Sequence, residues 1–465
     1  MKYVADLHLH SKYSRAVSQS MNLETMSEWA AKKGIDILST GDWTHPLWFR
    51  QIKESLVEAS QGLYELKSKI KDQRSKVRFL LSVEVSSIYS QGGKVRRIHN
   101  LIFAPSFETV EKVNRELLRR GVNLSSDGRP IMGISSAQLL EIVLTIDKNC
   151  LLIPCHAWTP WFSLYGSNSG FDSIEECFPK LSKYIFGVET GLSSDPEMNW
   201  RIKELDNRSI LSFSDAHSPA KMGREATVFE LEKPTFENIR KAIMYPVISS
   251  QLSVVGSKSV SLQLTGKQKT DNRILYTIEF YPEEGKYHYT GHRNCGVVQT
   301  PDETKERGTV CPSCKRLLTV GVMQRVQDLA REFKNQNSKF KIDEYGVKWI
   351  EDPKDIHPPF VRLVPLLEII SESLSSTVAS LKVKEAFDRL VDNFGSEINI
   401  LLKTGLADIE RVSGSKVSDG IKKVRTGDIT IAPGFDGEFG KVKIWKDDGQ
   451  ARVEIKAKED QLGLF

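Results

Sequence analysis

Short apolar segments alternate with amphipathic segments through the first half of this chain of 465 residues, and this alternation restricts the fold more than any other feature. Short apolar runs are typical of buried strands, and apolar residues at helical spacing are typical of helices. The expected strands are KYVADL, IDILST, RFLLSVEV, RIHNLIFA, CLLIPC, YIFGVET and SILSFS. The expected helices include LETMSEWAAKKG, the stretch 51–71, FETVEKVNRELLRRG, SAQLLEIVLTID and TFENIRKAIM. Repeated strand–helix units predict an α/β fold with a mostly parallel sheet, open or closed into a barrel, over residues 1–247.

Composition narrows the class of protein. With 40% hydrophobic and 9% aromatic residues, the chain is neither wholly disordered nor a coiled coil. The first residues place Asp6, His8 and His10 where a secretion signal needs an apolar core. No apolar run approaches the roughly 18 residues that span a bilayer, so we expect a cytoplasmic protein without a membrane partner. Of the six cysteines, we interpret three as buried packing residues: Cys150, Cys155 and Cys177.

Histidines and carboxylates follow the ends of the expected strands. Because the carboxyl ends of barrel strands converge on one face, these side chains should meet there. Imidazole and carboxylate groups are ligands for divalent ions such as zinc and manganese. The alternative is that each is a hydrogen-bonded polar group at a strand end, but six of the nine histidines lie in this region. The predicted metal ligands are His8, His10, Asp42, Glu84, His99, His156, Asp215 and His217.

Two further residues of this region have less defined roles. His45 is either a ligand or a residue that positions the loop after Asp42. Glu189 is a ligand, a group that supports a ligand, or a contact for substrate.

Several motifs, taken in order, resemble the PHP family, the polymerase and histidinol phosphatase domain. They are DLHLH, the TGD that contains Asp42, the glutamate in VEV, the isolated His99, PCHAW and SDAH. The resemblance covers about the first 245 residues and implies a distorted β/α barrel of seven strands with two to three ions of zinc, manganese or magnesium. Two departures are SKYSRA, where relatives carry a further histidine, and Asp42, where they usually carry histidine.

The resemblance also implies a ligand set for each ion. One ion would be held by His8, His10, Glu84 and Asp215. A second would take Glu84 as a bridge with His99 and His156, and a third would take Asp42 and His217. Paired ions lower the pKa of a bound water and stabilise the attacking and leaving oxygens at phosphorus. The expected reaction is hydrolysis of a phosphate ester, with Asp215, Glu84 and His156 as the catalytic set.

A second cluster of ligand-type residues follows the barrel. His292-x2-Cys295 and Cys311-x2-Cys314 form two short pairs, and Gly296 allows a tight turn after the first. The spacing is close to a zinc ribbon and predicts one structural zinc ion; His288 is an alternative to His292, and buried thiols are the alternative to zinc. Residues 286–349 carry 12 basic and 7 acidic side chains. The basic side chains are either DNA contacts or part of a solvated face.

These later segments narrow the resemblance. HRNCG with CPSCKRLLTVGV, PPFVRLVPLLEII, the loop that begins HAWTPWF, and ETGLSSDPEMNW together resemble the endonuclease Q family. This resemblance implies an endonuclease that cuts DNA on the 5′ side of deaminated bases (uracil, hypoxanthine, xanthine) and abasic sites. It leaves a 3′-hydroxyl and a 5′-phosphate.

Recognition of a damaged base usually requires the nucleotide to leave the stack, and aromatic and basic residues near the metal motifs could then contact it. The loop 156–172 is either the lesion contact or a packed surface loop, and basic residues nearby are candidate phosphate contacts. The candidate DNA contacts are Trp158, Trp161, Phe162, Tyr165, Ser167, Asn168, Ser169, Lys94, Arg96, Arg97, Lys221 and Arg224.

The expected boundaries place the barrel at 1–247, a β-rich connector at 248–285, the zinc module at 286–350, a helical DNA-binding region at 351–403, a small module without a readable motif at 404–458 and a tail at 459–465. The tail QLGLF resembles the pentapeptide with which bacterial proteins bind the sliding clamp; the alternative is a frayed end. Its expected clamp contacts are Gln461, Leu462, Leu464 and Phe465.

Two other functions compete with the endonuclease. The first is a small-molecule phosphatase of the PHP family, which leaves the zinc module and the tail unexplained. The second is a DNA-binding adaptor that is tethered to the clamp and whose barrel is stabilised by metal but does not catalyse. An intact ligand set argues against the adaptor.

Overall fold

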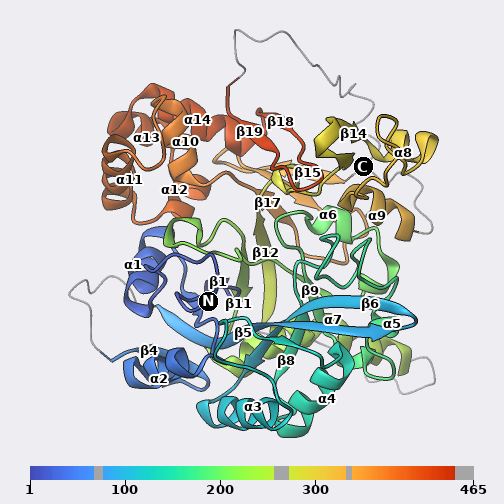
Figure 1. The fold of residues 1–465 in the computed structure, drawn as a ribbon. Coiled ribbons are helices and arrows are strands. Elements are labelled where there is room, and N and C mark those ends of the chain that lie inside the picture. Colours follow the sequence, from blue (N-terminus) through green and yellow to red (C-terminus); the bar gives the residue numbers. More distant parts are fainter. Residues whose placement is uncertain (68–76, 256–271, 331–337, 446–465) are drawn as a thin grey trace. The chain divides into compact units, whose positions relative to one another are not determined.

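A computed structural model describes residues 1–67, 77–255, 272–330 and 338–445 (Figure 1). The clamp-like residues Gln461–Phe465 lie outside the described residues. The chain divides into two compact units: unit 1 is Met1–Ala31, Ile35–Gly191 and Glu204–Thr277, and unit 2 is Lys32–Gly34, Leu192–Lys203 and the described residues from Ile278 onward. Over the described ranges we find no helix with the length and apolar character that a membrane crossing requires.

Unit 1 contains a mixed sheet in the order β12-β11-β1-β2-β5-β4-β3, with β6 and β7 beside β5 and β8 beside β6. The strands are β1 Lys2–Asp6, β2 Ile37–Ser39, β3 Leu56–Ser60, β4 Leu63–Leu66, β5 Arg78–Gln91, β6 Lys94–Ala104, β7 Ile131–Met132, β8 Leu151–Pro154, β11 Ala226–Glu230 and β12 Arg273–Glu279. A separate parallel pair is formed by β9 Gly187–Glu189 and β10 Ser209–Leu211.

The expectation of a mostly parallel sheet is wrong. β1 pairs in parallel with β2, and β2 with β5, but β5 and β6 form a long antiparallel hairpin, and β8 is antiparallel to β6. The connection between β5 and β6 is the pair Gly92–Gly93, both at positive φ (61° and 73°). A two-residue turn of this kind joins antiparallel strands, whereas parallel strands need a long crossover.

The expected long helix at 51–71 is also wrong. The helix α2 ends at Ser55, and the chain turns through Gly62 into a hairpin of β3 and β4. Gly62 has a φ of 69°, and a Cβ at this position would lie 2.5 Å from the Cβ of Phe236. The turn therefore requires glycine, and the helical pattern stops before it. Residues 68–71 lie outside the described residues.

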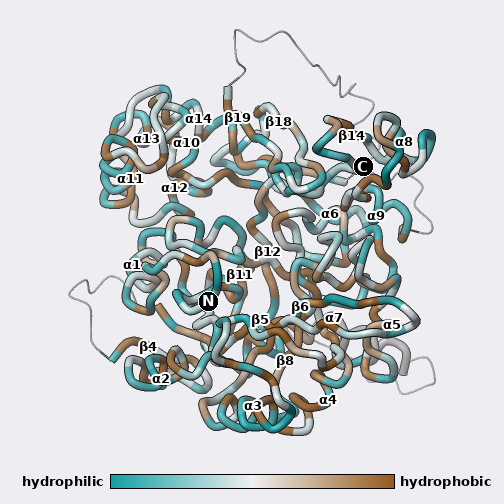
Figure 2. Tube along the Cα trace, viewed as in Figure 1, coloured by the Kyte–Doolittle hydropathy of each residue, from teal (hydrophilic) through white to brown (hydrophobic). Residues whose placement is uncertain are grey.

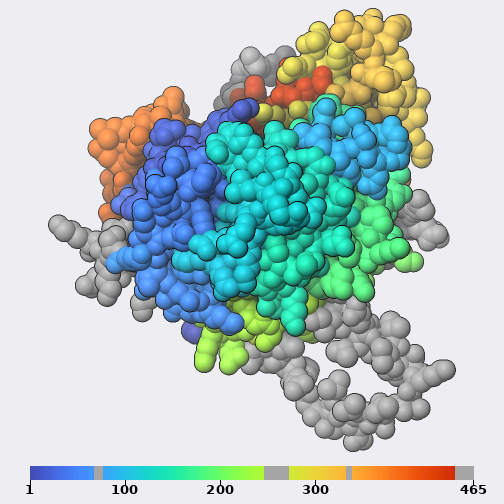
Figure 3. Space-filling model, turned by 60° about the horizontal axis from the view of Figure 1, so that its bottom comes forward, coloured from blue at the N-terminus to red at the C-terminus, as the bar shows by residue number. Residues whose placement is uncertain are grey.

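The helices α3 and α4 of unit 1 begin at serine residues that cap them. Ser106 accepts a hydrogen bond from the backbone N–H of Thr109 at the start of α3, and Ser135 forms a capping box with Gln138 at the start of α4. Figure 3 brings the bottom of Figure 1 forward and shows unit 1 in blue to green. The helices are α1 Leu23–Lys33, α2 Pro46–Ser55, α3 Phe107–Arg119, α4 Ser136–Ile146, α5 Ile174–Cys177 and α7 Phe236–Val255.

The core of unit 1 lies where strands meet these helices. Val110, Val113 and Leu117 of α3 are buried at helical spacing, so one face of this helix is apolar. Hydrophobic and hydrophilic residues therefore follow one another along its trace in Figure 2. The sheet contributes a buried cluster that includes Leu7, Phe103, Ile153 and Phe213. Because the strands are anchored through these apolar residues, the polar residues at their ends are held in place.

The expected β-rich connector begins later than the sequence suggests. The helix α7 continues to Val255, past Pro246, a residue that normally predicts the end of a helix. The strand β12 then begins at Arg273.

Unit 2 combines small strands with a helical region. β15 Lys339–Ile342, β16 Lys348–Glu351 and β17 Phe360–Arg362 pair antiparallel in that order. PPFVRLVPLLEII is therefore a strand followed by a helix that begins after Pro365, rather than one helix. The helices are α6 Pro196–Asn199, α8 Pro301–Arg307, α9 Val322–Leu329, α10 Leu366–Ser373, α11 Leu381–Phe394, α12 Glu397–Lys403, α13 Leu406–Ser413 and α14 Ser415–Thr426. The remaining strands are β13 Thr290–His292, β14 Val297–Gln299, β18 Thr430–Ala432 and β19 Lys441–Lys443.

Candidate metal centre

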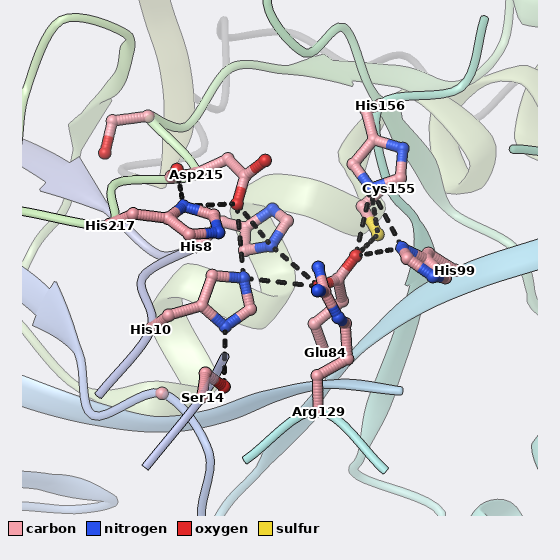
Figure 4. A network of polar contacts seen from close by, with 12 residues as sticks. His8, His10, Ser14, Glu84, His99, Arg129, Cys155, His156, Asp215 and His217 are labelled. Atoms are coloured by element: carbon pink, nitrogen blue, oxygen red, sulfur yellow. Dashed lines mark hydrogen bonds and ion pairs between the residues drawn. The ribbon is translucent and has the colours of Figure 1, made fainter. Parts of the chain in front are cut away.

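Histidines and carboxylates from separate strands of unit 1 meet in one buried cluster (Figure 4). His8 and His10 follow β1, Glu84 lies in β5, His99 lies in β6, and Asp215 follows β10. His8, His10 and Glu84 are buried, and His99 is 7% exposed. His8, His10 and Asp215 thus follow strand ends as expected, whereas Glu84 and His99 lie within their strands, and the fold brings together residues that are far apart in the sequence.

The first group of ligand atoms comes from His8, His10, Glu84 and Asp215, whose nitrogens and oxygens lie close together. His10 Nε2 lies 3.2 Å from Glu84 Oε2 and 3.2 Å from Asp215 Oδ1. His8 Nε2 lies 3.8 Å from Glu84 Oε2 and 3.6 Å from Asp215 Oδ1. Within the described part of the chain, both Nε2 atoms and Asp215 Oδ1 are buried without a regular hydrogen bond. Buried polar atoms are normally paired, so this set fits a divalent cation.

The second group lies at the other oxygen of Glu84. Oε1 lies 2.5 Å from His99 Nδ1 and 2.9 Å from His156 Nε2, and these two nitrogens are 3.3 Å apart. Figure 4 shows Glu84 between the His8–His10 side and the His99–His156 side. One carboxylate therefore faces both groups, as a carboxylate that bridges two ions would.

Two carboxylates contact the Nδ1 atoms of His8 and His10, on the side of each ring opposite its Nε2 atom. Glu189 Oε1 lies 2.9 Å from His8 Nδ1, and its Oε2 accepts a hydrogen bond from the His156 backbone N–H at 2.8 Å. Asp42 Oδ1 lies 3.1 Å from His10 Nδ1. A carboxylate on the far nitrogen fixes the ring so that Nε2 faces the centre.

Asp42 and His217 do not share a site in the structure. The Oδ2 atom of Asp42 accepts hydrogen bonds from Ser11 and from Ser14 Oγ, the latter at 3.0 Å. His217 instead groups with His10 and Asp215. His45 stacks on Tyr13 at 4.5 Å between ring centroids and belongs to none of the ligand groups found among the described residues.

Carboxylates of the centre raise the pKa of two of its histidines. Burial alone would lower the pKa of His8, but the carboxylates of Glu189 and Asp215 hold that pKa well above its usual value. Burial also opposes protonation of His10, whose pKa is raised by Asp215, Asp42 and Glu84. Such a centre attracts cations, and protons compete with metal ions for its histidines.

Three residues of the centre have left-handed backbone conformations. Asp42, His156 and Asp215 have φ values of 49°, 32° and 46°. Non-glycine residues in this region are strained, and such residues cluster at functional sites. The strain is held by the surrounding contacts, which include the Glu189 carboxylate on the His156 N–H.

The centre contains one cation, Arg129, that the sequence did not predict. Arg129 Nη1 lies 3.0 Å from Glu84 Oε2, and the side chain is 26% exposed. Its backbone N–H donates to Asp127 Oδ1 at 3.1 Å. At Gly128 an added Cβ would lie 2.4 Å from the Asp42 carboxylate, so this loop approaches the centre closely. The only sequence signal was the turn-forming pair Asp127–Gly128.

The loop 156–172 divides into packed and accessible residues. Trp158 and Tyr165 are buried and stack at 4.6 Å, and the Tyr165 hydroxyl donates to Glu204 at 2.8 Å. Phe162 is half-buried and packs on His99 at 4.7 Å between ring centroids. Of the remaining loop candidates, Trp161 and Ser167 are half-buried, Asn168 is exposed, and Ser169 is buried.

The basic candidates near the centre are mostly half-buried. The guanidinium of Arg97 lies 5.7 Å from the Phe162 ring centroid, and that of Arg96 lies 4.1 Å from the Phe171 ring centroid. Arg224 Nε donates to the Ser214 carbonyl at 3.0 Å. Lys221 is half-buried and Lys94 is exposed.

The four predicted ligands of the cysteine module come together in unit 2. The ligand atoms of all four lie within 4.8 Å of one another: His292, Cys295, Cys311 and Cys314. The backbone N–H of Cys314 lowers the pKa of Cys311 to about 6, which favours the thiolate. His288 does not belong to this group. Gly296 has a φ of 63° and closes the first turn, as its position predicts.

The fold of the whole chain matches a solved structure. The lesion-specific endonuclease PfuEndoQ from Pyrococcus furiosus is 30% identical, with a TM-score of 0.76 and coverage of 98% of each chain. This chain belongs to the endonuclease Q family. A second endonuclease Q structure, a complex with a 27-mer duplex that carries an abasic lesion at the active site, has the same identity and TM-score and covers 98% of this chain and 99% of the other.

Two further comparisons match smaller parts of this endonuclease Q chain. The family described as the MJ0043 C-terminal domain matches residues 365–428, which contain α10–α14. The uncharacterized protein MJ0043 of Methanocaldococcus jannaschii is 30% identical over 296 residues, which is 62% of this chain. The match spans only 31% of that protein's own length.

Proposed function

We propose that this chain is a metal-dependent endonuclease that hydrolyses DNA on the 5′ side of deaminated bases (uracil, hypoxanthine, xanthine) and abasic sites. Membership of the endonuclease Q family supports this function. The observation that carries it is the position of Glu84, whose two oxygens face two separate groups of buried ligands. A centre for paired ions suits attack on a phosphodiester.

His8, His10, Glu84 and Asp215 would hold one ion, and Glu84, His99 and His156 a second. When bound, such ions activate a water molecule and neutralise charge at the scissile phosphate. The oxygen of water forms a bond to phosphorus, the P–O3′ bond breaks, and the leaving oxygen takes a proton. The products are a 3′-hydroxyl and a 5′-phosphate.

The residues around the ligands have supporting roles in this proposal. Glu189 orients His8, and Asp42 orients His10, rather than binding an ion itself. A third ion would be held by His217 and Asp215. The Arg129 guanidinium, at the edge of the centre, would contact a phosphate oxygen once an ion occupies Glu84.

We propose that Phe162, which packs on His99, contacts the displaced nucleotide together with the half-buried Trp161 and the exposed Asn168 of the same loop. The buried pair Trp158 and Tyr165 would hold the loop in shape. Extrusion of a base costs a few kcal/mol, and damaged pairs reduce this cost, which favours lesions over intact DNA.

We also propose that unit 1 is a PHP-type barrel and that the His292 module is a zinc ribbon with one structural zinc ion. The donor set of one imidazole and three thiols is typical of structural zinc sites. The helical region that follows would contact DNA.

The deciding experiment uses a labelled duplex with one deoxyinosine, with and without manganese, beside the same duplex without the lesion. We expect one manganese-dependent break on the 5′ side of the lesion, and the product should carry a 3′-hydroxyl that a polymerase can extend. Hydrolysis of small phosphomonoesters without a break in the duplex would instead support the PHP phosphatase.

The tail QLGLF is proposed to bind a bacterial sliding clamp. Deletion of residues 461–465 should weaken clamp binding at least about tenfold, because buried apolar anchors dominate such interfaces. Nicking of a short duplex without the clamp should not change. Surface plasmon resonance on immobilised clamp measures the first effect, and equal clamp affinity of the two forms would contradict the assignment.

A further inference from the structure

The thiol of Cys155 lies inside the metal centre, although the mechanism above gives it no role. Its Sγ atom lies 3.6 Å from Glu84 Oε1 and 3.7 Å from His156 Nε2 (Figure 4). The side chain is buried, and Cys155 also forms a possible ligand group with His8 and Glu189. From the sequence alone, Cys155 is expected to be a packing residue.

The backbone is arranged so that two consecutive side chains reach the centre. In an extended strand, Cys155 and His156 would point to opposite faces. The φ of 32° at His156 breaks this alternation, and both side chains contact Glu84 Oε1. The Cys155 N–H donates to the His99 carbonyl at 3.2 Å, and the His156 N–H donates to Glu189 at 2.8 Å. These bonds hold the strained turn in place.

The distances suit a tetrahedral ion. With metal–sulfur and metal–nitrogen bonds of about 2.3 and 2.0 Å, the edge of a zinc tetrahedron between S and N is about 3.5 Å. The Sγ–Nε2 distance of 3.7 Å is close to this edge. Sulfur favours zinc over manganese and magnesium, which prefer oxygen.

We propose that Cys155 is a ligand beside Glu84 and His156, and that it makes this position select a thiophilic ion such as zinc. The position at His8, His10, Glu84 and Asp215, whose ligands carry no sulfur, takes manganese or magnesium. The assignment deepens the proposed function and rests on its paired-ion centre. The competing explanation is that the thiol only donates a hydrogen bond to Glu84.

The test compares the full-length wild type with Cys155→Ser and with Cys150→Ser. Cys150 is a matched control, because it is buried only five residues away and belongs to none of the ligand groups found in the described ranges. Each protein is titrated with cadmium, and the thiolate-to-cadmium charge-transfer absorption is recorded. Exchange into the His292 module contributes equally to all three proteins.

We expect Cys155→Ser to lack one thiolate–cadmium bond per chain that the wild type and Cys150→Ser both form. Its zinc affinity at this position should fall about tenfold or more, while its manganese affinity changes less than about threefold. Identical absorption in all three proteins would overturn the assignment. If Cys155→Ser does not fold, the ¹¹³Cd NMR spectrum of the wild type decides: a resonance shifted by one thiolate beside that of the His292 module is expected, and its absence would also overturn the assignment.

Nicking of the deoxyinosine duplex is measured on the same samples. A wild type that forms the Cys155–cadmium bond but never cuts lesion DNA with any ion would refute the endonuclease and leave the ligand assignment intact. A wild type that cuts lesion DNA without forming the Cys155–cadmium bond would support the endonuclease and refute the ligand assignment.

Discussion

Asp215 contributes to the centre through a single buried oxygen that lies 3.2 Å from His10 Nε2. Asp215→Asn keeps the shape of the side chain but removes its charge. We expect the rate of cutting to fall at least about a hundredfold, because a metal ligand is weakened. DNA affinity, measured by fluorescence anisotropy, should change less than about threefold. Asp302→Asn, at an exposed aspartate, is the control; equal loss of cutting and binding in Asp215→Asn would reject the assigned role.

Arg129 and Arg15 are two arginines whose positions depend on Asp127. Asp127 accepts a hydrogen bond from the Arg129 backbone, and its carboxylate lies 3.6 Å from Arg15 Nε. Only Arg129 faces Glu84, while the Arg15 side chain is 78% exposed. Arg129→Ala should lower kcat about tenfold to a thousandfold with metal affinity retained, because a cation at the phosphate is lost in the transition state. Single-turnover kinetics and manganese titration separate the two effects, and Arg15→Ala should behave as the wild type.

At the scale of elements, the loop between β16 and β17 depends on one carboxylate. Asp352 accepts hydrogen bonds from the backbone of Lys354 and His357 and lies 2.8 Å from His357 Nδ1. Burial alone would raise the pKa of Asp352, but the His357 side chain and these N–H groups lower it to about 2. The folded pKa lies below the ordinary value of 3.8, so the stabilisation is complete above about pH 4 and is lost as the pH falls toward 2.

Asp352→Asn should therefore lower the free energy of unfolding of unit 2 by about 1–3 kcal/mol at pH 7. The difference from the wild type should shrink between pH 4 and pH 2, since the wild-type carboxylate is then protonated. Urea unfolding at several pH values measures both effects. Asp355→Asn is the control, because the Asp355 side chain lies in the same loop but is 78% exposed. A difference independent of pH would contradict the role of the charge.

The element scale also shows what a sequence pattern can miss. The pair Gly92–Gly93 between two apolar runs was a readable hairpin signal, and the helix prediction at 51–71 passed over Gly62. In both the β5–β6 hairpin and the β3–β4 hairpin, glycines that allow a positive φ interrupt the apolar periodicity and start a turn.

At the scale of the whole molecule, metal binding should be coupled to folding. Manganese at about a hundred times its dissociation constant stabilises the native state by about 2.7 kcal/mol, which should raise the melting temperature of unit 1 by about 5–10 °C. The increase should shrink from pH 7.5 to pH 5.5, because His8 and His10 have raised pKa values and protons displace the ion. Differential scanning calorimetry with and without EDTA measures it. Glu84→Gln should abolish the increase, and Glu116→Gln should retain it.

The sequence by itself determined which residues of unit 1 could serve as ligands, and it grouped His292 with the three nearby cysteines, because the spacing within a short segment decides which side a residue faces. Only the tertiary structure decided which oxygen of Glu84 meets which histidines, that Asp42 supports His10, and that Arg129 and Cys155 belong to the centre. These contacts join segments far apart in the chain. Their distances depend on strand order, on the register of the β5–β6 hairpin and on the left-handed turn at His156, none of which local spacing specifies.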